Sequence, residues 1–497
     1  MTNVPDSTPR ILWSSPDHWA EQDCACADED FASVSRGSTT YLTARDLQDA
    51  EWQITPGVYS RRLTAHHILH VNPSSDAGVA VLNHPAQDVL DAFAAPKSID
   101  QVVTAFSQSE RPLVYDTCVS LARLKLLQKQ FAAAMPPYKP TTLTAWLHVT
   151  NACNLRCSYC YLGKTDEAMD EETGRAAVDA IFRSAVQHRF DAVKLKYAGG
   201  EATLNFRLVQ RLHAYANALA QDYGLRLQEV VLSNGVALSH AMLDFIRESN
   251  MRLMISLDGV GQAHDAQRAF ANGRGSAHLV KRSIQRALSR GVEPYLSITV
   301  TGHNAATLTD TITFALDHDL LFNLNFYRDN DYAADHDALI TEDARLIAGV
   351  QAAFKVIEER LPRHNLIAAL LDRANFGTPH DRACGAGHNY MVIDHNGRIA
   401  RCHMEIERTI TDVRVEDPLA FIQAHDIGFR NVSVDNKEGC RDCTWRQWCA
   451  GGCPLLTYRV TGRSDVQSPY CNVYRALYPE VVRLEGLRLL MWEAQAA

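Results

Sequence analysis

The spacing of the cysteines constrains this chain more than any other feature. Ten of its 13 cysteines form two arrays. The first is Cys153-x3-Cys157-x2-Cys160, and the second consists of Cys384, Cys402, Cys440, Cys443, Cys449, Cys453 and Cys471. Three thiolates can hold three irons of a [4Fe–4S] cube and leave the fourth iron open to a small molecule, whereas a fully ligated cluster moves electrons or supports structure. We therefore interpret the first array as catalytic and the second as auxiliary.

Length and composition set the class of protein. A chain of 497 residues is expected to form about two to four domains. Its 46% hydrophobic and 22% charged residues are typical of a soluble globular protein. The net charge of −9 favours neither a nucleic-acid partner nor an anionic membrane. We expect no membrane association and no nucleic-acid partner.

The sequence also predicts the compartment. No apolar run approaches the roughly 20 residues that span a bilayer. The first six residues lack the basic start and apolar core of a signal peptide. We expect a cytoplasmic protein, in whose reducing environment cysteines bind metal more readily than they form disulfides.

Residues 1–50 are polar and show no regular hydrophobic pattern, and residues 51–135 are predicted to form a small domain. Cys24 and Cys26 in the first segment are either incidental thiols or a metal-binding pair, and their role stays open. In the domain, two short strands at 68–71 and 79–82 flank a turn-rich segment. Three helical patterns follow: the first contains Val89, Leu90 and Phe93, Ser98 caps the second, and the third spans 115–129 and buries Cys118.

Strands and helices alternate through residues 141–365, which predicts a parallel α/β sheet with right-handed crossovers. Six strand–helix units are too few for the usual eight-unit closed barrel, so we expect a partial barrel with functional residues just after the carboxyl ends of its strands. The expected strands are Ala145–Val149, Ala192–Tyr197, Glu229–Leu232, Arg252–Leu257, Pro294–Val300 and Phe322–Phe326.

Four motifs follow the first four predicted strands. The three-cysteine loop follows the first strand, and Gly199–Glu201 follows the second. Ser233–Gly235 follows the third, and Ser256–Gly259 ends the fourth. Because the carboxyl ends of parallel strands meet at one edge, all four motifs are expected to open onto one face.

The three-cysteine loop, with Tyr159 before its third cysteine, resembles the signature of the radical S-adenosylmethionine (SAM) superfamily. The resemblance implies that the open iron binds the amino and carboxylate groups of SAM. Reductive cleavage then yields methionine and a 5′-deoxyadenosyl radical that abstracts hydrogen from substrate, while the protein positions the cofactors. The alternative is a zinc site, for which His148 is a candidate fourth ligand.

By the same resemblance, the strand-end residues bind SAM. Gly199, Gly200 and Glu201 are similar to the motif that binds the amino group, whose donors need acceptors. Ser233, Asn234 and Ser256 are similar in position to the groups that contact the ribose and carboxylate of SAM, and Tyr159 of the cluster loop is assigned to cofactor binding. Arg268 either binds the SAM carboxylate or is a solvated helix arginine. Asp258 is expected to be a structural carboxylate.

Residues 366–497 match the seven-cysteine SPASM pattern, including Gly397-x4-Cys402 and Cys440-x2-Cys443-x5-Cys449-x3-Cys453. The resemblance implies one [4Fe–4S] cluster on Cys440, Cys443, Cys449 and Cys471 and another on Cys384, Cys402 and Cys453. The second cluster lacks one ligand, so either an eighth group completes it, for which His388 and His403 are candidates, or an iron is open to a substrate thiolate. Zinc ribbons are the alternative to this pattern.

Two positions separate this chain from the sulfatase maturases that it also resembles. Those enzymes carry an extra cysteine where this chain has Tyr390, and a catalytic aspartate where it has His403. Residues 51–135 resemble the winged-helix domains that hold a leader peptide by adding it as a strand to an exposed sheet edge. A DNA-binding helix-turn-helix is the alternative. The basic residues that would contact DNA, or that are otherwise solvated charges, are Arg61, Arg62, Arg123, Lys125 and Lys129.

The resemblance therefore implies a peptide maturase with three [4Fe–4S] clusters and SAM, served by a flavodoxin- or ferredoxin-type electron donor. It would modify a ribosomal precursor peptide that carries a leader, forming a thioether, a carbon–carbon or carbon–oxygen bond, or an oxidised residue. The alternatives are a formylglycine-generating maturase, another SPASM dehydrogenase, and an iron–sulfur sensor that binds DNA. Candidate bases are His403, Glu405, Tyr327 and Asp329.

Overall fold

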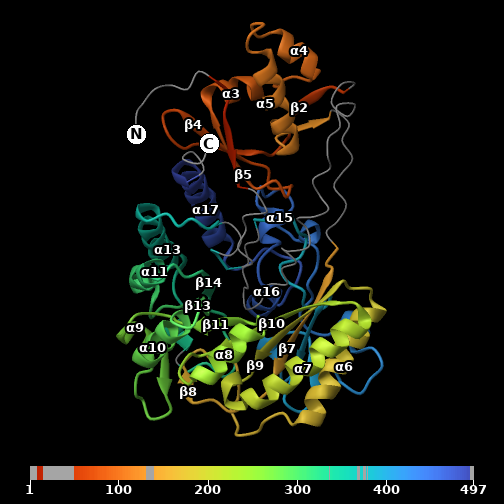
Figure 1. Cartoon of the computed structure of the whole chain (residues 1–497), viewed down its shortest axis with the longest axis vertical. Coiled ribbons are helices and arrows are strands. Elements are labelled where there is room, and N and C mark those ends of the chain that lie inside the picture. Colours follow the sequence, from red (N-terminus) through yellow and green to blue (C-terminus); the bar gives the residue numbers. More distant parts are fainter. Residues whose placement is uncertain are drawn as a thin grey trace.

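The computed structural model describes residues 8–14, 50–129, 139–334, 336–366, 370–372, 376–377 and 379–492. Cys24 and Cys26 lie outside these residues. A large sheet with helices around it forms one end of the molecule, and the N-terminal domain forms the other end (Figure 1). Residues 446–492 of the C-terminal segment lie between them.

The large sheet contains six parallel strands in the order β14-β13-β11-β10-β9-β7, which confirms the predicted α/β fold. Its parallel pairing continues from β7 to β15, and the antiparallel strands β16 and β17 follow. The sheet is therefore open, and it incorporates strands from the cysteine-rich C-terminal part, which the sequence did not predict. The strands are β7 (Thr142–His148), β9 (Ala192–Ala198), β10 (Arg226–Ser233), β11 (Arg252–Ser256), β13 (Tyr295–Val300), β14 (Phe322–Phe326), β15 (Tyr390–Ile393), β16 (Arg398–Ala400) and β17 (Thr411–Asp412).

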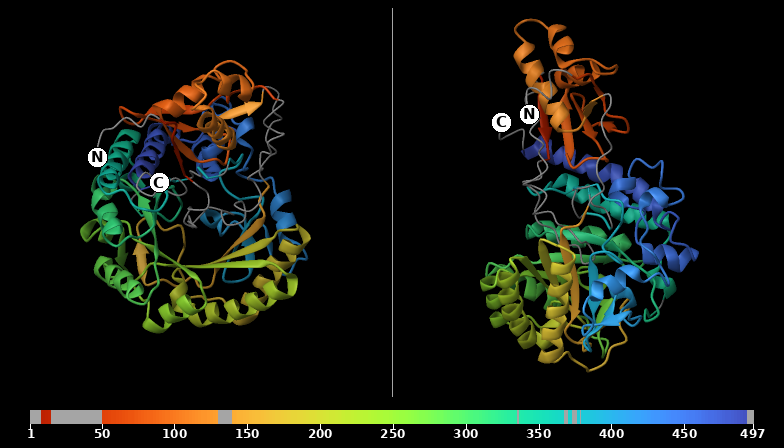
Figure 2. Two further views of the ribbon diagram at one scale, coloured as in Figure 1. Left: turned by 45° about the horizontal axis from the view of Figure 1, so that its top comes forward. Right: turned by 90° about the vertical axis from the view of Figure 1, so that its right-hand side faces the viewer.

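Helices cover the outer face of this sheet (Figure 2). Local sequence sets their ends: the Asp170 side chain accepts the amide of Thr173 at the start of α6, and the left-handed Gly224 ends α7. Residues of β7 and β9 are buried throughout, as expected for strands covered on both faces. The helices are α6 (Glu171–Gln187), α7 (Phe206–Tyr223), α8 (His240–Glu248), α9 (Gln262–Asp265), α10 (Ala277–Leu288), α11 (Leu308–Asp317), α12 (His336–Leu339) and α13 (Asp343–Glu359).

The N-terminal domain has a four-stranded antiparallel sheet in the order β1-β5-β4-β3. The predicted hairpin is present as β4 and β5, and the three predicted helices follow it. The elements are β1 (Ile11–Trp13), β2 (Trp52–Ile54), β3 (Tyr59–Arg62), β4 (His67–Val71), β5 (Val79–Asn83), β6 (Leu127–Lys129), α3 (His84–Asp91), α4 (Ile99–Thr104) and α5 (Arg111–Arg123).

One predicted boundary in this domain is wrong. The third helix does not reach residue 129: it ends at Arg123, and the chain turns at Lys125, whose φ is +54°. Residues Leu127–Lys129 then pair with β2 as a strand. This pairing between distant segments overrides the local helical pattern. Cys118 is fully buried in the domain core, as predicted, and Ser98 caps α4.

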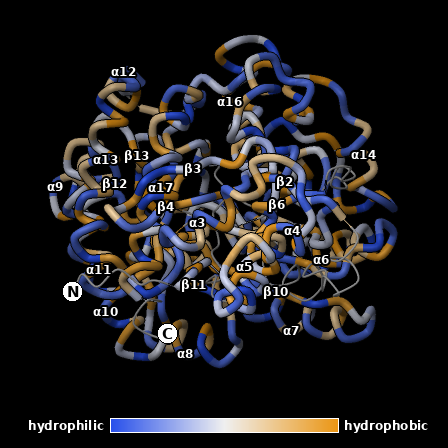
Figure 3. The backbone as a smooth tube through the Cα atoms, turned by 90° about the horizontal axis from the view of Figure 1, so that it is seen from above, coloured by the Kyte–Doolittle hydropathy of each residue, from blue (hydrophilic) through white to orange (hydrophobic). Residues whose placement is uncertain are grey.

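The C-terminal segment is built from short helices and one long helix that begins at Cys471. This long helix packs against α13 and also contacts β5 of the N-terminal domain. Among the described helices, none is long and apolar enough to cross a bilayer, and hydrophilic and hydrophobic stretches alternate over the molecule (Figure 3). The helices are α14 (Pro418–Ala424), α15 (Arg446–Cys449), α16 (Pro454–Thr461) and α17 (Cys471–Trp492).

A buried polar network joins the N-terminal strand to α17. The fully buried Glu485 accepts the hydroxyl of Ser14 at 2.9 Å and forms an ion pair with Arg488 at 2.9 Å. The backbone amide of Leu366 donates to the same carboxylate at 3.0 Å, and Asn365 donates to the Ser14 hydroxyl at 2.7 Å. Three segments far apart in the sequence therefore meet at one carboxylate.

We expect Glu485→Ala to lower the free energy of unfolding by about 3–5 kcal/mol, because Arg488 would remain buried without its charge partner. Glu171→Ala is the control, since it removes only the exposed pairs with Arg175 and Arg211 and should cost less than about 1 kcal/mol. Urea denaturation followed by circular dichroism measures both, and equal losses would contradict the role given to Glu485.

Candidate functional site

The three-cysteine loop leaves the carboxyl end of β7 and is held by a two-stranded ribbon. Strand β8 (Leu155–Cys157) pairs antiparallel with β12 (Arg268–Phe270), which sets Cys157 opposite Arg268. The amide of Ser158 donates to the carbonyl of Gln267 at 2.9 Å and continues the pairing. The ribbon therefore fixes an arginine beside the second cysteine of the loop.

The thiols of this loop lie in a buried and cationic environment. Burial raises the pKa of the Cys157 thiol to about 11; Arg268 and Lys164 lower the pKa, and the neighbouring Cys160 and Cys153 raise it. Burial likewise raises the pKa of Cys153, against the opposing effect of Lys164. Two fixed cations beside three mutually interacting thiols fit an anionic thiolate-bound cluster.

Gly199 and Gly200 press against the backbone that precedes Cys153. A Cβ atom on Gly199 would lie 2.2 Å from the carbonyl oxygen of Thr150, and one on Gly200 would lie 2.2 Å from that of Ala152. The amide of Gly200 donates to Thr150 at 2.8 Å, and that of Glu201 donates to Ala152 at 2.9 Å. The glycines thus have a role that sequence reasoning missed: they let the end of β9 hold the three-cysteine loop.

The buried Glu201 carboxylate ties together the ends of β9 and β10. One oxygen accepts the hydroxyls of Thr203 at 2.6 Å and Ser233 at 2.8 Å, and the other accepts the amide of Asn234 at 2.7 Å. The Asn234 side chain donates to Asn154 Oδ1 in the three-cysteine loop at 2.7 Å. Glu201, Ser233 and Asn234 therefore form one connected set with that loop.

Asp258, Tyr159 and Arg268 form a second buried set. Asp258 accepts the amide of Thr299 at 2.8 Å and the hydroxyl of Tyr159. It also pairs with Arg268 at 3.5 Å, and Arg268 donates to the Tyr159 oxygen. Burial raises the pKa of Asp258, and Arg268 and Tyr159 oppose that effect. This arrangement supports the structural role expected for Asp258, which orients both Tyr159 and Arg268.

A cavity of about 220 Å³ lies at the edge where these sets meet. Eleven residues that were assigned a role from the sequence line it: Tyr159, Cys160, Gly199, Gly200, Glu201, Ser233, Asn234, Ser256, Arg268, Tyr327 and His403. Cys153 and Cys157 are not among its lining residues. Sequence reasoning missed other parts of the wall, although the inward-facing alternation along each strand could have indicated some of them: Trp146, Tyr161, Leu232, Met254, Ser297, Thr299, Asn325, Phe326, Arg328 and Met404.

An aromatic group forms another wall of the cavity and includes His403. The His403 ring stacks on Trp146 at 4.6 Å and meets Tyr161 edge-on at 5.2 Å. The Tyr390 hydroxyl lies 3.3 Å from His403 Nδ1. Of the four candidate bases, His403 and Tyr327 line the cavity; Asp329 and Glu405 are not among its lining residues.

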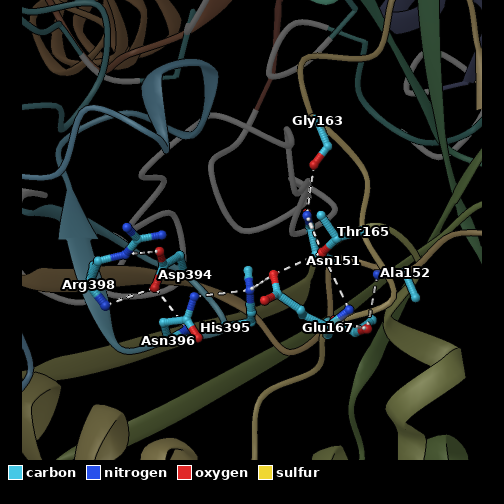
Figure 4. Close-up of polar contacts among 10 residues, drawn as sticks. Asn151, Ala152, Gly163, Thr165, Glu167, Asp394, His395, Asn396 and Arg398 are labelled. Carbon is cyan, nitrogen blue, oxygen red and sulfur yellow. Dashed lines mark hydrogen bonds and ion pairs between the residues drawn. The ribbon is translucent and has the colours of Figure 1, made fainter.

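Polar contacts tie the three-cysteine loop to the β15–β16 hairpin that leads to Cys402 (Figure 4). The backbone carbonyl of Glu167 accepts the amide of Asn151 at 2.8 Å. The Glu167 carboxylate lies 3.0 Å from His395 Nε2 in the hairpin turn. The two cysteine arrays are thus linked through the sheet edge as well as through strand pairing.

Four of the C-terminal cysteines share one small cavity. Cys440, Cys443, Cys449 and Cys471 line it together with Trp445, Tyr474, Arg475 and Tyr478. Burial raises the pKa of Cys440 to about 11 and that of Cys449 to about 12. Four convergent thiols with apolar and aromatic neighbours fit the ligand set of a fully ligated cluster.

The other three cysteines meet in a separate apolar cluster. Cys384, Cys402 and Cys453 pack around Ala386, Phe429 and Leu455. His388 Nε2 lies 3.2 Å from the carbonyl oxygen of Asn431, and the His403 ring faces the aromatic wall described above. Within the described residues, no three metal-binding side chains meet as closely as a single ion needs. The identity of an eighth ligand stays a prediction.

Comparison with known proteins agrees with this geometry. Residues 147–315 match the model of the Radical SAM superfamily. A cysteine-type anaerobic sulfatase-maturating enzyme of Clostridium perfringens is 19% identical over 356 residues, covering 66% of this chain and 93% of that protein. The PqqA peptide cyclase of Bradyrhizobium diazoefficiens is 22% identical over 363 residues, covering 70% of this chain and 90% of that protein.

The alignments with the first two curated relatives are shorter, and they cover 57% and 51% of those proteins. Among solved structures, anSMEcpe with bound AdoMet and the Kp18Cys peptide has a TM-score of 0.56 at 16% identity. That match covers 69% of this chain and 99% of the other. The structural match shows a shared fold.

We expect Gly200→Ala to displace the three-cysteine loop, because the added methyl group would overlap the Ala152 carbonyl. After anaerobic reconstitution, the variant should bind about one cluster less iron than the unchanged protein. Gly224→Ala is the control: its Cβ meets nothing within 4 Å, so it should keep full iron despite the strained φ of +66°. Full iron in Gly200→Ala would refute the positioning role.

Proposed function

We propose that this protein is a radical SAM peptide maturase, because residues 147–315 match the model of the Radical SAM superfamily. One observation carries the proposal. The cavity joins Cys160 of the three-cysteine loop to the predicted SAM-binding residues at four strand ends, and His403 and Met404 of the C-terminal segment line it as well. A redox sensor or DNA-binding protein has no need of such a cavity.

The cavity residues suit the two ends of SAM. Arg268 lines the cavity, and Asp258 and Tyr159 hold its guanidinium, so it can bind the carboxylate. The backbone carbonyls of Gly199 and Gly200 can accept the ammonium, since four protein donors already bind the Glu201 carboxylate. When bound, the cluster and SAM supply a 5′-deoxyadenosyl radical. The protein orients the reactants.

The aromatic wall offers groups for a substrate proton. His403 and Tyr327 line the cavity, and the Tyr327 hydroxyl donates to Asp329 at 3.0 Å. Burial raises the pKa of Tyr327, so it stays protonated, and the imidazole of His403 is the better acceptor. We propose His403 as the residue that accepts a proton from substrate.

We propose that the C-terminal cysteines hold two auxiliary [4Fe–4S] clusters. Cys440, Cys443, Cys449 and Cys471 share a cavity that fits one of them. Cys384, Cys402 and Cys453 gather at a second site. These clusters would accept an electron as product forms, and a flavodoxin- or ferredoxin-type protein of the cytoplasm would reduce the SAM-binding cluster.

The N-terminal sheet is the proposed leader-binding surface. The chain's own strand β1 covers the outer edge of β5, which leaves β3 as the other edge of the sheet. The amide of Leu63 donates inward to His67, so alternation along the strand turns the amides of Ser60 and Arg62 outward. Both residues are exposed. An extended leader can add to this edge as a fifth strand.

The similarity to the PqqA peptide cyclase supports a peptide substrate, and the similarity to the sulfatase-maturating enzyme supports a second candidate function. The PqqA peptide cyclase is named for a peptide substrate. The sulfatase-maturating relative makes formylglycine formation, or another SPASM dehydrogenation, the alternative. Short open reading frames beside the gene provide candidate precursors, and assays with those peptides and with a sulfatase-derived peptide distinguish the candidates. The bond formed, whether thioether, carbon–carbon or carbon–oxygen, would follow from the product mass.

Replacing Cys153, Cys157 and Cys160 together by Ala should abolish SAM cleavage and remove about one cluster of iron. The assay is 5′-deoxyadenosine formation with dithionite under anaerobic conditions, measured by mass spectrometry. The Cys118→Ala variant serves as the control, since Cys118 is buried in the N-terminal domain and should leave cleavage unchanged. Cleavage by the triple variant would refute the radical SAM assignment.

Ser60→Pro should weaken binding of a precursor peptide at least tenfold, because it removes an outward amide from the β3 edge. Ser60→Ala is the matched control: it loses the hydroxyl contact to His70 Nδ1 at 2.8 Å but keeps the amide, and its affinity should match that of the unchanged protein. Fluorescence anisotropy with labelled peptide measures both. Unchanged affinity in Ser60→Pro would place the leader elsewhere.

A further inference from the structure

Lys437 is a buried lysine beside the C-terminal cysteines, and nothing above assigns it a role. Its side chain is 1% exposed, and its ammonium donates to the carbonyl of Ala450 at 3.0 Å. Among the described residues, no carboxylate forms an ion pair with it. A buried ammonium is costly unless negative charge lies nearby, so the identity of that charge is informative.

The backbone between Cys449 and Cys453 is shaped around this lysine. Ala450, Gly451 and Gly452 all have positive φ angles, of 46°, 78° and 68°. A Cβ atom on Gly451 would lie 2.5 Å from Lys437 Cδ and 2.7 Å from Nζ. Only a glycine permits both the left-handed conformation and this close approach. The position of the ammonium is therefore built into the same loop that carries two proposed cluster ligands.

The ammonium lies within electrostatic reach of both C-terminal cysteine sites. Burial lowers the pKa of Lys437, and four cysteines oppose this effect. Two of them, Cys449 and Cys440, belong to the four-cysteine site, and the other two, Cys384 and Cys453, belong to the three-cysteine site. These four cysteines belong to two different sites, and their sulfur atoms would be anionic when they ligate the proposed clusters.

We infer that Lys437 holds one positive charge between the two auxiliary clusters and raises the reduction potential of both. This inference rests on the proposed function, which places the clusters there. When an oxidised cluster takes up one electron, it gains one negative charge, and a cation in a low-dielectric interior stabilises that reduced form. In the proposed reaction the electron comes from the substrate-derived radical, so Lys437 favours its transfer to an auxiliary cluster.

Arg475 provides a matched comparison on the same cluster site. It lines the four-cysteine cavity and lies near Cys471 and Cys443, but it is exposed to solvent. Solvent screens an exposed charge more strongly than a buried one. Removing Arg475 should therefore change the potential less than removing Lys437, although each residue carries one positive charge.

The test is a redox titration in full-length protein that also carries Cys153→Ala, Cys157→Ala and Cys160→Ala, so that only auxiliary clusters contribute to the electron paramagnetic resonance signal. We expect Lys437→Met to lower the equilibrium constant for reduction at least tenfold, which is 59 mV for a one-electron couple. Arg475→Met should lower it less than threefold. Lys437→Gln keeps a donor for Ala450, and Lys437→Arg keeps the charge.

The outcomes distinguish failure of the proposed auxiliary clusters from failure of the role proposed for Lys437. Absence of auxiliary iron in the parent protein would refute the proposed clusters. If all variants hold full iron, the role of charge is supported by two results together. The midpoint reduction potential falls in the neutral variants Lys437→Met and Lys437→Gln, and in Lys437→Arg it equals that of the parent protein. Equal midpoints in the parent and both neutral variants, or an equal shift in Arg475→Met, overturn it. Loss of iron from both neutral variants, with retention in Lys437→Arg, would give the lysine a structural role and also overturn the inference.

Discussion

The close contact between Gly199–Gly200 and the backbone of Thr150–Ala152 holds the three-cysteine loop against the sheet edge. Two backbone hydrogen bonds form across this contact, and a Cβ atom at either glycine would overlap a carbonyl oxygen. The loop leaves β7, and the glycines follow β9, which pairs directly with β7. The cavity exists because two neighbouring strand ends can approach without side chains between them.

Two buried carboxylates organise the rest of that edge. Glu201 and Asp258 each bind several protein donors, and each connects elements that are distant in the sequence. Their charge is largely committed to holding the loop, Tyr159 and Arg268 in place. Gly199, Gly200 and Arg268 line the cavity, and we propose their backbone carbonyls and guanidinium as the groups that bind a zwitterionic ligand.

The C-terminal segment is integrated with both other parts of the molecule. Strand β15 extends the large sheet beside β7, which brings His403 onto the indole of Trp146. On the side of the N-terminal domain, the ring centroids of Tyr59 and Trp445 lie 5.0 Å apart, and Trp445 lines the four-cysteine cavity. The proposed peptide-binding edge, auxiliary site and cavity are thus parts of one packed structure, in which each can be positioned relative to the others.

The sequence by itself determined the features that depend on near neighbours along the chain. Cysteine spacing, the alternation of strands with helices and the cap at Ser98 could all be read there, and parallel topology then placed the strand-end residues together. Only the tertiary structure decided that β6 replaces the end of a predicted helix, that β15 joins β7, and that the Lys437 side chain lies against the Ala450–Gly451 backbone between Cys449 and Cys453. These features depend on pairing and packing between distant segments, whose free energy is not contained in any local pattern.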